Sequence, residues 1–336
     1  MGAFSECEIM NATQQEKEIY GEEVQIVSRS SDCVIYRIVD GSGAMVMTSY
    51  QVFPGIQLIY NDVHIGRCSI DYGVFGNVME INHCREGRIE CGYREEFFYL
   101  TQGDLAVSKT GAAGHGSYFP LNHYHGIAIV IDIDRAPACM SCFLDDVNVR
   151  PCVLMEKFCR GGKCFVARSK PCLEHIFSEL YAVPDSIRKG YFKVKILELL
   201  LFLSGMDLSE DQIEKRCFTK TQVGLTKSVC EYLAEHMDSR VTISELADIF
   251  HVSQTALKNS FKGVFGVSVY SYIREQKMQA AALMLRQTER SVLEIAGMCG
   301  YDNGSKFAGA FRNVMGMTPN EYRNTRNEEE QPQEDT

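Results

Sequence analysis

Residues 242–268, "TISELADIFHVSQTALKNSFKGVFGVS", and residues 291–318, "SVLEIAGMCGYDNGSKFAGAFRNVMGMT", are two versions of one pattern. Each begins with Ser or Thr followed three residues later by Glu, which is the capping-box signature of a helix start. Each continues with apolar residues at helical spacing, a short turn, and a second helical run that reaches a glycine. We therefore predict two helix-turn-helix units, which begin at Thr242 and Ser291.

The two units agree position by position when one extra residue is allowed in the second turn. The second helices are expected to begin after Ser253 and Asn303. In the order of the chain, the matched core positions are Ile243, Leu246, Ala247, Phe250, Leu257, Phe261 and Val264, which correspond to Val292, Ile295, Ala296, Cys299, Phe307, Phe311 and Val314.

Between the units, residues 268–288 ("SVYSYIREQKMQAAALMLRQT") are expected to form one continuous helix. About 20 residues at 1.5 Å per residue give a spacer of roughly 30 Å. Successive major-groove faces of B-DNA are about 34 Å apart. Such a spacer can place two recognition helices in adjacent grooves on one side of a duplex.

These features together resemble a known protein family. Residues 222–323 are similar to the DNA-binding domain of AraC/XylS-type transcriptional regulators, through "ISELADIFHVSQTALKNSFKGVFG", "KMQAAALMLRQT", "VLEIAGMCGY" and "FAGAFRNVMGMTPNEYR". The resemblance implies double-stranded DNA as the partner and RNA polymerase as a candidate partner. It also implies an N-terminal cupin-like sensor barrel that is followed by dimerising helices.

The N-terminal half has the pattern of a β-rich domain. Its short β-branched and aromatic runs alternate with turn sequences such as "DGSG" and "TQGD", which is typical of an antiparallel sandwich or barrel. The predicted strands are 34–39, 56–60, 78–82, 96–100, 104–108 and 126–133. Helices are predicted over 172–183, with Leu173, Ile176, Phe177 and Leu180 on one face, and over 187–206, which is apolar on more than one face.

The predicted fold class is α+β, with a cupin-like antiparallel β-barrel, a helical dimerisation segment and an all-α double helix-turn-helix domain. The predicted parts are a sensor domain (1–140), a connecting segment (141–206), a linker (207–221), the DNA-binding domain (222–325) and an acidic disordered tail (326–336). We expect a homodimer that forms through residues 172–206.

A recognition helix reads bases through outward side chains near its N-terminus. In the first unit we assign Ala256, Leu257 and Phe261 to the core. The predicted DNA-contacting residues are Ser253, Gln254, Thr255, Lys258, Asn259 and Lys262 in the first unit, and Asn303, Ser305, Lys306, Gly309 and Arg312 in the second. By the resemblance, Thr255 and Asn259 occupy base-contacting positions; the alternative is an ordinary solvated helix face. Asn pairs with adenine and Thr can contact a thymine methyl group.

The second recognition helix departs from the family pattern at Gly309, where many members carry a long polar or basic side chain. With Gly304 also outward, this helix offers few side chains for base contacts. We therefore expect it mainly to hold phosphates, through Lys306, Arg312 and the helix N-terminus. Glycine at 309 indicates either a close approach of DNA or of another helix, or a tolerated position on a solvent face.

Composition indicates a globular protein with free thiols. The chain is 45% hydrophobic and contains 14 cysteines. No stretch has the roughly 18 consecutive apolar residues of a membrane helix, and the N-terminus lacks the features of a secretory signal, so we expect a cytoplasmic protein without a membrane partner. Residues 219–326 contain 13 basic and 10 acidic residues in a chain of net charge −10, a mild indication of a polyanionic partner.

His123 and His125 have the spacing of two ligands on one strand face, but no Glu follows where a cupin metal site would need it. We therefore expect a loop or pocket lining, and predict no metal, no cofactor and no catalytic residue. The cysteines of residues 139–172 (Cys139, Cys142, Cys152, Cys159, Cys164 and Cys172) include one C-x-x-C without a second pair at zinc spacing. We interpret them as small buried thiols.

The sequence thus predicts a bacterial DNA-binding transcriptional regulator that is not an enzyme and that a small-molecule effector in the barrel controls. Two alternatives stay open. One is a cupin-type metal-dependent enzyme with an appended helical domain, and the other is a cysteine-based redox or metal sensor. The residues do not identify the effector, the operator, or whether the protein activates or represses.

Overall fold

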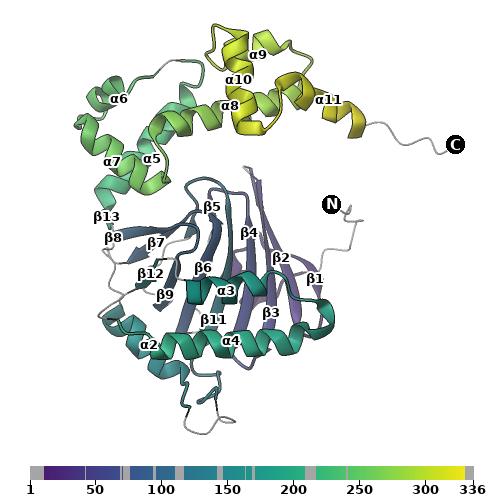
Figure 1. The fold of residues 1–336 in the computed structure, drawn as a ribbon, viewed down its shortest axis with the longest axis vertical. Coiled ribbons are helices and arrows are strands. Elements are labelled where there is room, and N and C mark those ends of the chain that lie inside the picture. The colour runs from purple at the N-terminus through teal and green to yellow at the C-terminus, as the bar shows by residue number, and fades with distance from the viewer. Residues whose placement is uncertain are drawn as a thin grey trace, which may run out of the picture. The chain divides into compact units, whose positions relative to one another are not determined.

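The computed structural model describes residues 11–41, 43–68, 70, 76–93, 96–109, 117–141, 147–162, 164–168, 171–208, 217–239 and 241–329. They belong to two compact units, Met1–Thr219 and Lys220–Thr336, and each has an apolar core of its own (Figure 1). Most of the predicted acidic tail lies outside the described residues. Within the described part of the chain, no helix is both long and apolar enough to cross a membrane.

The N-terminal unit is built on two antiparallel sheets. The larger sheet consists, in spatial order, of β1 (Gln25–Arg29), β2 (Cys33–Asp40), β3 (Gly43–Phe53), β4 (Ile56–Val63), β11 (Tyr124–Asp132), β6 (Val78–Gly87), β9 (Leu105–Lys109) and β12 (Phe165–Ala167). The smaller sheet consists of β13 (Phe218–Thr219), β8 (Glu96–Leu100), β7 (Ile89–Tyr93), β10 (Ser117–Tyr118) and β5 (Arg67–Cys68). The chain is therefore α+β, as predicted.

Two apolar cores lie on opposite faces of the larger sheet, because successive residues of a strand point to opposite faces. Ile59 and Ala128 belong to the core that the larger sheet shares with Phe98 and Leu100 of the smaller sheet. Their neighbours on the other face belong to a core shared with α2 (Pro151–Cys159), α3 (Pro171–Leu180) and α4 (Arg188–Gly205). Figure 1 shows α3 and α4 running across the strands of this sheet, and α1 (Gln14–Tyr20) contributes Ile19 and Tyr20 to the first core.

All six predicted strands are present, but β3, the longest strand, was not among them. Its sequence "GAMVMTSYQVF" contains Gly, Ala, Ser and Thr and lacks a compact β-branched run, so pairing with β2 and β4 decides its conformation. The predicted face of α3 is buried, with Leu173, Ile176, Phe177 and Leu180 all at 3% exposure or less. Phe218 and Thr219, inside the predicted linker, pair with β8.

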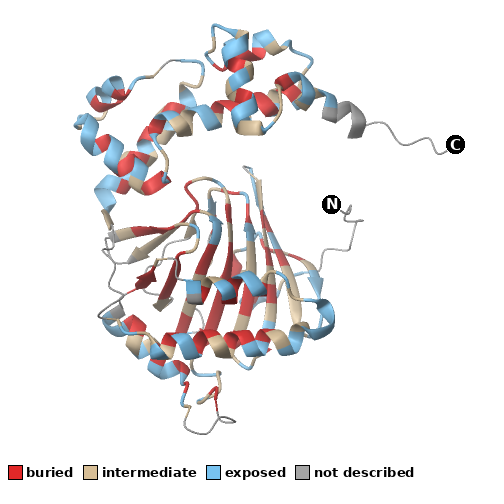
Figure 2. Cartoon of the chain, in the orientation of Figure 1, coloured by how far each residue is buried: buried red, intermediate tan, exposed pale blue. Residues whose placement is uncertain are grey.

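The C-terminal unit is helical throughout its described length, apart from short turns. Its helices are α5 (Lys220–Glu235), α6 (Ile243–Ile249), α7 (Gln254–Phe265), α8 (Val269–Gln287), α9 (Val292–Met298), α10 (Gly304–Met315) and α11 (Pro319–Glu329). In Figure 2 the buried residues of these helices alternate with exposed ones along each helix, which is the pattern of amphipathic helices around a small core. Helices α6 with α7 and α9 with α10 are the two predicted helix-turn-helix units.

Candidate nucleic-acid interface

The first helix of each unit is held by the predicted capping box. The Thr242 amide donates to Oε2 of Glu245 at 2.8 Å, and the Glu245 amide donates to Oγ1 of Thr242 at 3.3 Å. The hydrogen bond from the Thr242 backbone holds the pKa of the Glu245 carboxyl below its usual value. Ser291 and Glu294 repeat this arrangement at 2.7 and 3.2 Å. Both short helices therefore begin at positions that local sequence defines.

The second helix of each unit also begins at a side-chain cap. Oγ of Ser253 accepts from the Ala256 amide at 3.1 Å, and α7 ends at Gly266 in the left-handed conformation. Oδ1 of Asn303 accepts from the amides of Ser305 and Lys306 at 2.8 and 3.1 Å, and α10 ends at Gly316, also left-handed. The two predicted recognition helices are thus both 12 residues long, and each begins at a side-chain cap and ends at a left-handed glycine.

The predicted contact residues of the first unit are all exposed. Leu257 and Phe261 are fully buried, as predicted, but Ala256 is exposed, so its assignment to the core was wrong. Ala256 directly precedes Leu257 but lies outside the buried face of α7, which consists of Leu257, Ser260, Phe261, Val264 and Phe265. The outward surface therefore consists of Ser253, Gln254, Thr255, Ala256, Lys258, Asn259 and Lys262.

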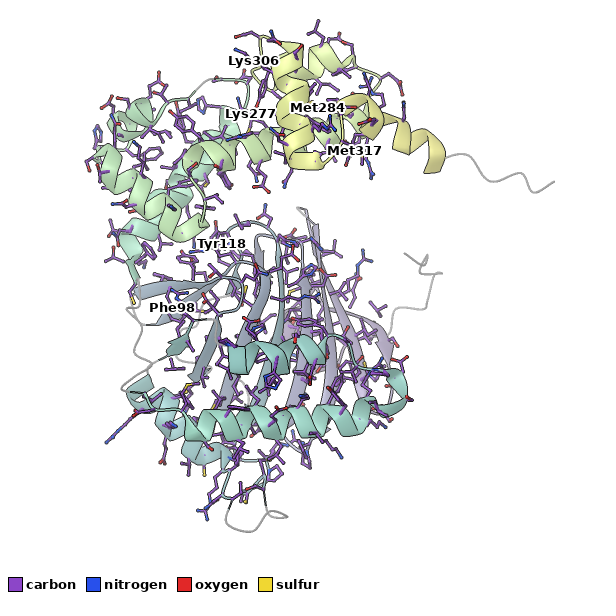
Figure 3. All side chains as sticks on the ribbon, viewed as in Figure 1. Phe98, Tyr118, Lys277, Met284, Lys306 and Met317 are labelled. Carbon is purple, nitrogen blue, oxygen red and sulfur yellow. The ribbon has the colours of Figure 1, made fainter. Side chains whose placement is uncertain are left out.

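The predicted contact residues of the second unit are exposed as well. Asn303, Ser305, Lys306, Gly309 and Arg312 lie opposite a fully buried pair, Phe307 and Phe311. Gly304 is only half-buried, and a Cβ on it would lie 3.5 Å from Cδ1 of Leu293 on α9. This surface presents short polar groups and Lys306 near the N-terminus of α10, where Figure 3 shows Lys306, and Arg312 in the last turn of the helix.

Helix α8 connects the two units and packs against both. Its 19 residues give a length of about 28 Å. Near its start, the Tyr272 ring lies 4.9 Å from that of Phe265 on α7. Toward its end, Met278, Ala281, Ala282 and Leu285 share a core with the buried residues of α9 and α10. The predicted spacer is therefore a helix that packs against both helix-turn-helix units and holds them at its two ends.

Lys277, in the middle of α8, is a buried residue that the sequence reasoning did not single out. Its side chain is 7% exposed, its Nζ donates to the Ser239 carbonyl at 3.1 Å, and burial lowers its pKa. A Cβ on Gly300 would lie 2.9 Å from this Nζ and 2.8 Å from the Asp238 carbonyl oxygen. Lys277 therefore links the α9–α10 turn, at Gly300, to the loop between α5 and α6, at Ser239. The backbone of Gly300 has a positive φ (73°), a conformation that glycine adopts more easily than other residues.

Several residues of the closing motif "GMTPNEYR" (316–323) make caps and packing contacts. The Thr318 amide donates to Oε2 of Glu321 at 2.7 Å, which caps α11. The Tyr322 ring lies 5.5 Å from that of Phe311, and the Arg323 guanidinium donates to the Arg290 carbonyl. The most specific part of the resemblance thus fastens α11 to the second unit.

Gly309 has no close neighbour. Among the described residues, no heavy atom outside its own helix backbone lies within 4 Å of a Cβ placed on it, which removes packing against another helix as its explanation. We expect Gly309→Ala to raise the free energy of unfolding by somewhat under about 1 kcal/mol, since alanine has the higher helix propensity. Where DNA approaches this face closely, the same variant weakens specific binding by about 1 kcal/mol or more.

Thermal melts and DNA titrations of Gly309→Ala separate these effects. A lower melting temperature would contradict the expected stabilisation. Unchanged DNA affinity together with a higher melting temperature would show that the glycine is tolerated on a solvent face. The control is Gly300→Ala, which places a Cβ against the Asp238 carbonyl and is expected to lower the melting temperature.

Of the cysteines singled out in the sequence, Cys159 and Cys164 are buried, Cys139 is half-buried and Cys152 is exposed. Burial raises the pKa of the Cys159 thiol to about 11, which suits an unreactive thiol. Cys142 and the side chain of Cys172 lie outside the described residues. The interpretation as small buried thiols therefore fits two of the four that the structure describes.

Two capped helix-turn-helix units fixed to one long helix define a double helix-turn-helix protein. A helix-turn-helix domain family matches residues 246–325. The chain is 24% identical to the probable transcriptional regulator LumQ of Photobacterium leiognathi, over 52% of this chain and 69% of that protein. It is also 24% identical to the arabinose operon regulatory protein of Salmonella typhimurium, over 44% of this chain and 53% of that protein.

Among solved structures, an AraC-type DNA-binding domain protein from Chromobacterium violaceum is 29% identical, with 32% of this chain and 94% of that chain covered and a TM-score of 0.29. The chain thus spans about half the length of the Salmonella regulator. The C-terminal unit is therefore a helix-turn-helix domain that is similar to the corresponding part of AraC-type transcriptional regulators.

Proposed function

We propose that this protein is a sequence-specific DNA-binding regulator whose α7 reads bases while α10 mainly holds phosphates. The observation that carries the proposal is the repeated unit itself, with both recognition helices fixed to α8 and their outward faces polar and exposed. The face of α7 carries Thr255 and Asn259, which can contact thymine and adenine edges in the major groove. The face of α10 has glycine at 309 and cations at Lys306 and Arg312. It is therefore better suited to contacts with the phosphates of the DNA backbone than to contacts with bases.

The test compares Asn259→Ala and Lys306→Ala in the full chain, on a duplex selected from a random pool. Asn259→Ala is expected to cost about 1–3 kcal/mol on the selected site and to relax specificity at one base pair. Lys306→Ala is expected to weaken binding to all sequences alike and to reduce the salt slope by about one unit. Titrations at several salt concentrations measure both quantities, because each phosphate contact releases counterions.

The exposed Arg37 on β2, far from α7 and α10 in the sequence, offers a control, and Arg37→Ala is expected to leave binding unchanged. Equal sequence profiles for Asn259→Ala and Lys306→Ala would refute the division of labour between the two helices. Binding that does not depend on salt, or no binding at low salt, would refute the proposed function as a whole.

We further propose that a small-molecule effector binds between the two sheets, in the predicted barrel. Glu80 and Asn82 of β6 point to the face of the larger sheet that the smaller sheet covers, since Val78 and Cys84 of the same face belong to that core. Ala106 and Ala128, both with small side chains, are the cross-strand neighbours of Asn82. Burial raises the pKa of the Glu80 carboxyl. A polar effector group would meet this carboxyl and amide.

Helix α4 supports the proposed homodimer. Phe192, Ile196 and Leu199 pack onto the larger sheet. On its other side, Val194 is 62% exposed, and Leu201 and Phe202, which follow two turns later, are 43% and 40% exposed. An apolar stripe of this kind on an otherwise amphipathic helix suits a second copy of the same helix.

A further inference from the structure

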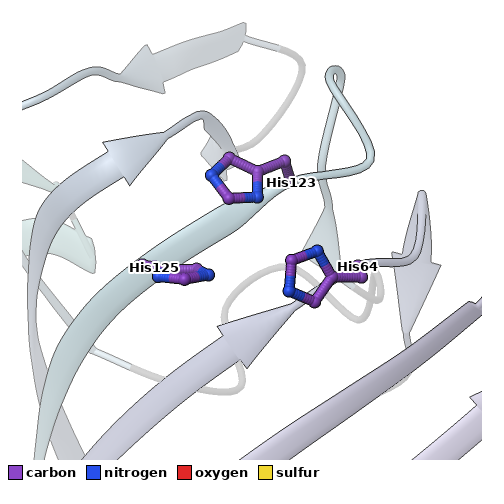
Figure 4. Close-up of side chains that lie close together, drawn as sticks. All are labelled: His64, His123 and His125. Carbon is purple, nitrogen blue, oxygen red and sulfur yellow. The ribbon is translucent and has the colours of Figure 1, made fainter. Parts of the chain in front are cut away.

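Three histidines that are separated in the chain come together at one end of the larger sheet. His64 directly follows β4, His123 directly precedes β11, and His125 is the second residue of β11 (Figure 4). One ring nitrogen from each lies within 4.8 Å of the others. The ring centroids of His123 and His125 are 4.7 Å apart, and that of His64 is 5.3 and 5.6 Å from them.

The register of β4 and β11 brings these residues together. The strands are antiparallel neighbours in which His125 pairs with Asp62 and Tyr124 pairs with Val63. Asp62 and His64 share one face of β4, and His123 and His125 share the same face of the adjacent chain segment, because side chains alternate. The His64 amide donates to the Ala44 carbonyl at 2.9 Å, which fixes the backbone at the end of the cluster.

Asp62 completes the cluster with an oxygen that two imidazoles share. Its Oδ1 lies 2.9 Å from Nε2 of His64 and 2.8 Å from Nε2 of His125. The His125 Nε2 atom is buried and makes no hydrogen bond within the described part of the chain, although this oxygen is so near. A nitrogen and a carboxylate oxygen that approach without an aligned N–H suit two ligands of one cation.

The cluster is separate from the proposed effector site. Tyr60 and Ile127 continue the same strand faces and pack in the core that the helices cover, whereas Glu80 and Asn82 belong to the opposite face. The cluster therefore lies on the helix-covered face. The side chains of His123 and His125 are each 33% exposed, and that of Asp62 is 55% exposed, so an ion can reach them from solution.

We propose that His64, His123 and His125, with Asp62 as the fourth ligand, bind one divalent transition-metal ion of the zinc type. Imidazole nitrogens and a carboxylate oxygen are donors that Zn²⁺ accepts in tetrahedral sites. Ligand atoms in such a site are about 3.3 Å apart at bonds of about 2.0–2.1 Å. The contacts with Asp62, at 2.9 and 2.8 Å, are shorter than this spacing, and the exposed His64 can rotate to adjust its distances to the other ligands. This inference does not depend on the proposed regulator function.

Glu86 has a supporting place beside the cluster. Its Oε1 lies 3.4 Å from Nε2 of His123, and its side chain is 63% exposed. A carboxylate next to a ligating imidazole orients the ring and raises its basicity. In the sequence, only the His123 and His125 pair was visible, because nothing in the local pattern around His64 indicates a third ligand.

The experiment is a Zn²⁺ titration of the reduced, metal-free full chain in competition with a chromophoric chelator. We expect one equivalent of Zn²⁺ per chain to bind at the cluster. The paired variant His64→Ala/His125→Ala is expected to weaken this binding by at least about 100-fold, since loss of two ligands exceeds the loss of an outer-shell partner. Asp62→Asn is expected to weaken it by about tenfold. Thermal melts should show that Zn²⁺ raises the melting temperature of the unaltered chain and of His175→Ala, but not that of the paired variant.

Two controls separate this site from other donors. His175→Ala removes an exposed histidine that is paired with Glu198 on the helices, and it is expected to leave Zn²⁺ binding unchanged. A Co²⁺ titration is expected to lack the thiolate charge-transfer band, which binding by any of the 14 cysteines would give. Equal affinity in the paired variant, a thiolate band, or no stoichiometric uptake would each overturn the proposal. DNA titrations of the same variants test the regulator function separately.

Discussion

Replacing Phe311 by alanine is expected to lower the free energy of unfolding of the C-terminal unit by about 3–5 kcal/mol. Phe311 is fully buried, and its ring lies 5.9 Å from Phe307 and 5.5 Å from Tyr322, so truncation removes contacts on both sides and leaves a cavity. Domains of this size are stable by only about 5–15 kcal/mol. The variant should therefore lose a large part of the stability of the C-terminal unit, and helices α8 to α11 should unfold at a much lower denaturant concentration.

Denaturant unfolding followed by far-ultraviolet circular dichroism measures this loss, because the helices dominate that signal and the chain has no tryptophan. Leu293→Ala is the matched control in the same unit. Leu293 is 67% exposed, so its truncation is expected to change stability by no more than about 0.5 kcal/mol. Equal losses for the two variants would show that Phe311 is not part of the core that holds α10.

Leu201→Glu/Phe202→Glu is expected to dissociate the proposed dimer and to reduce affinity for DNA with two sites by on the order of 10²–10⁴-fold. Both side chains are exposed on α4, opposite the residues that pack onto the sheet. Two facing copies would bring the introduced carboxylates together in an apolar interface, where charge is costly to bury. Affinity for a single site should stay unchanged, because α7 and α10 are untouched.

Analytical ultracentrifugation and titrations on one-site and two-site duplexes measure the two effects. Val39→Glu, at an exposed apolar position on β2, is the control and is expected to leave the dimer intact. A variant of α4 that stays dimeric, or a wild-type chain that is monomeric at the same concentration, would contradict dimerisation through this helix.

Much of the C-terminal unit could be predicted because its signals are local. Thr242 with Glu245, and Ser291 with Glu294, are three residues apart, and each pair forms the hydrogen bonds that the sequence indicates. The caps at Ser253 and Asn303 and the end at Gly316 are equally local. Leu257, Phe307 and Phe311 follow helical spacing, so their burial could be predicted without knowledge of the neighbouring helix. Ala256 was misassigned because a small apolar residue fits either side of a helix.

The sequence by itself therefore determined the two helix-turn-helix units, the long helix between them and the exposure of the predicted contact residues. Only the tertiary structure decided the conformation of β3, the need for glycine at Gly300 and the neighbours of His125. The last two depend on partners far away in the chain, the Asp238 carbonyl and the Asp62 carboxylate. Strand β3 pairs with its chain neighbours β2 and β4, and its conformation depends on the register of both pairings. A helix cap or an apolar stripe is fixed by residues within one or two turns, whereas a cross-strand contact exists only after a whole sheet has taken its register.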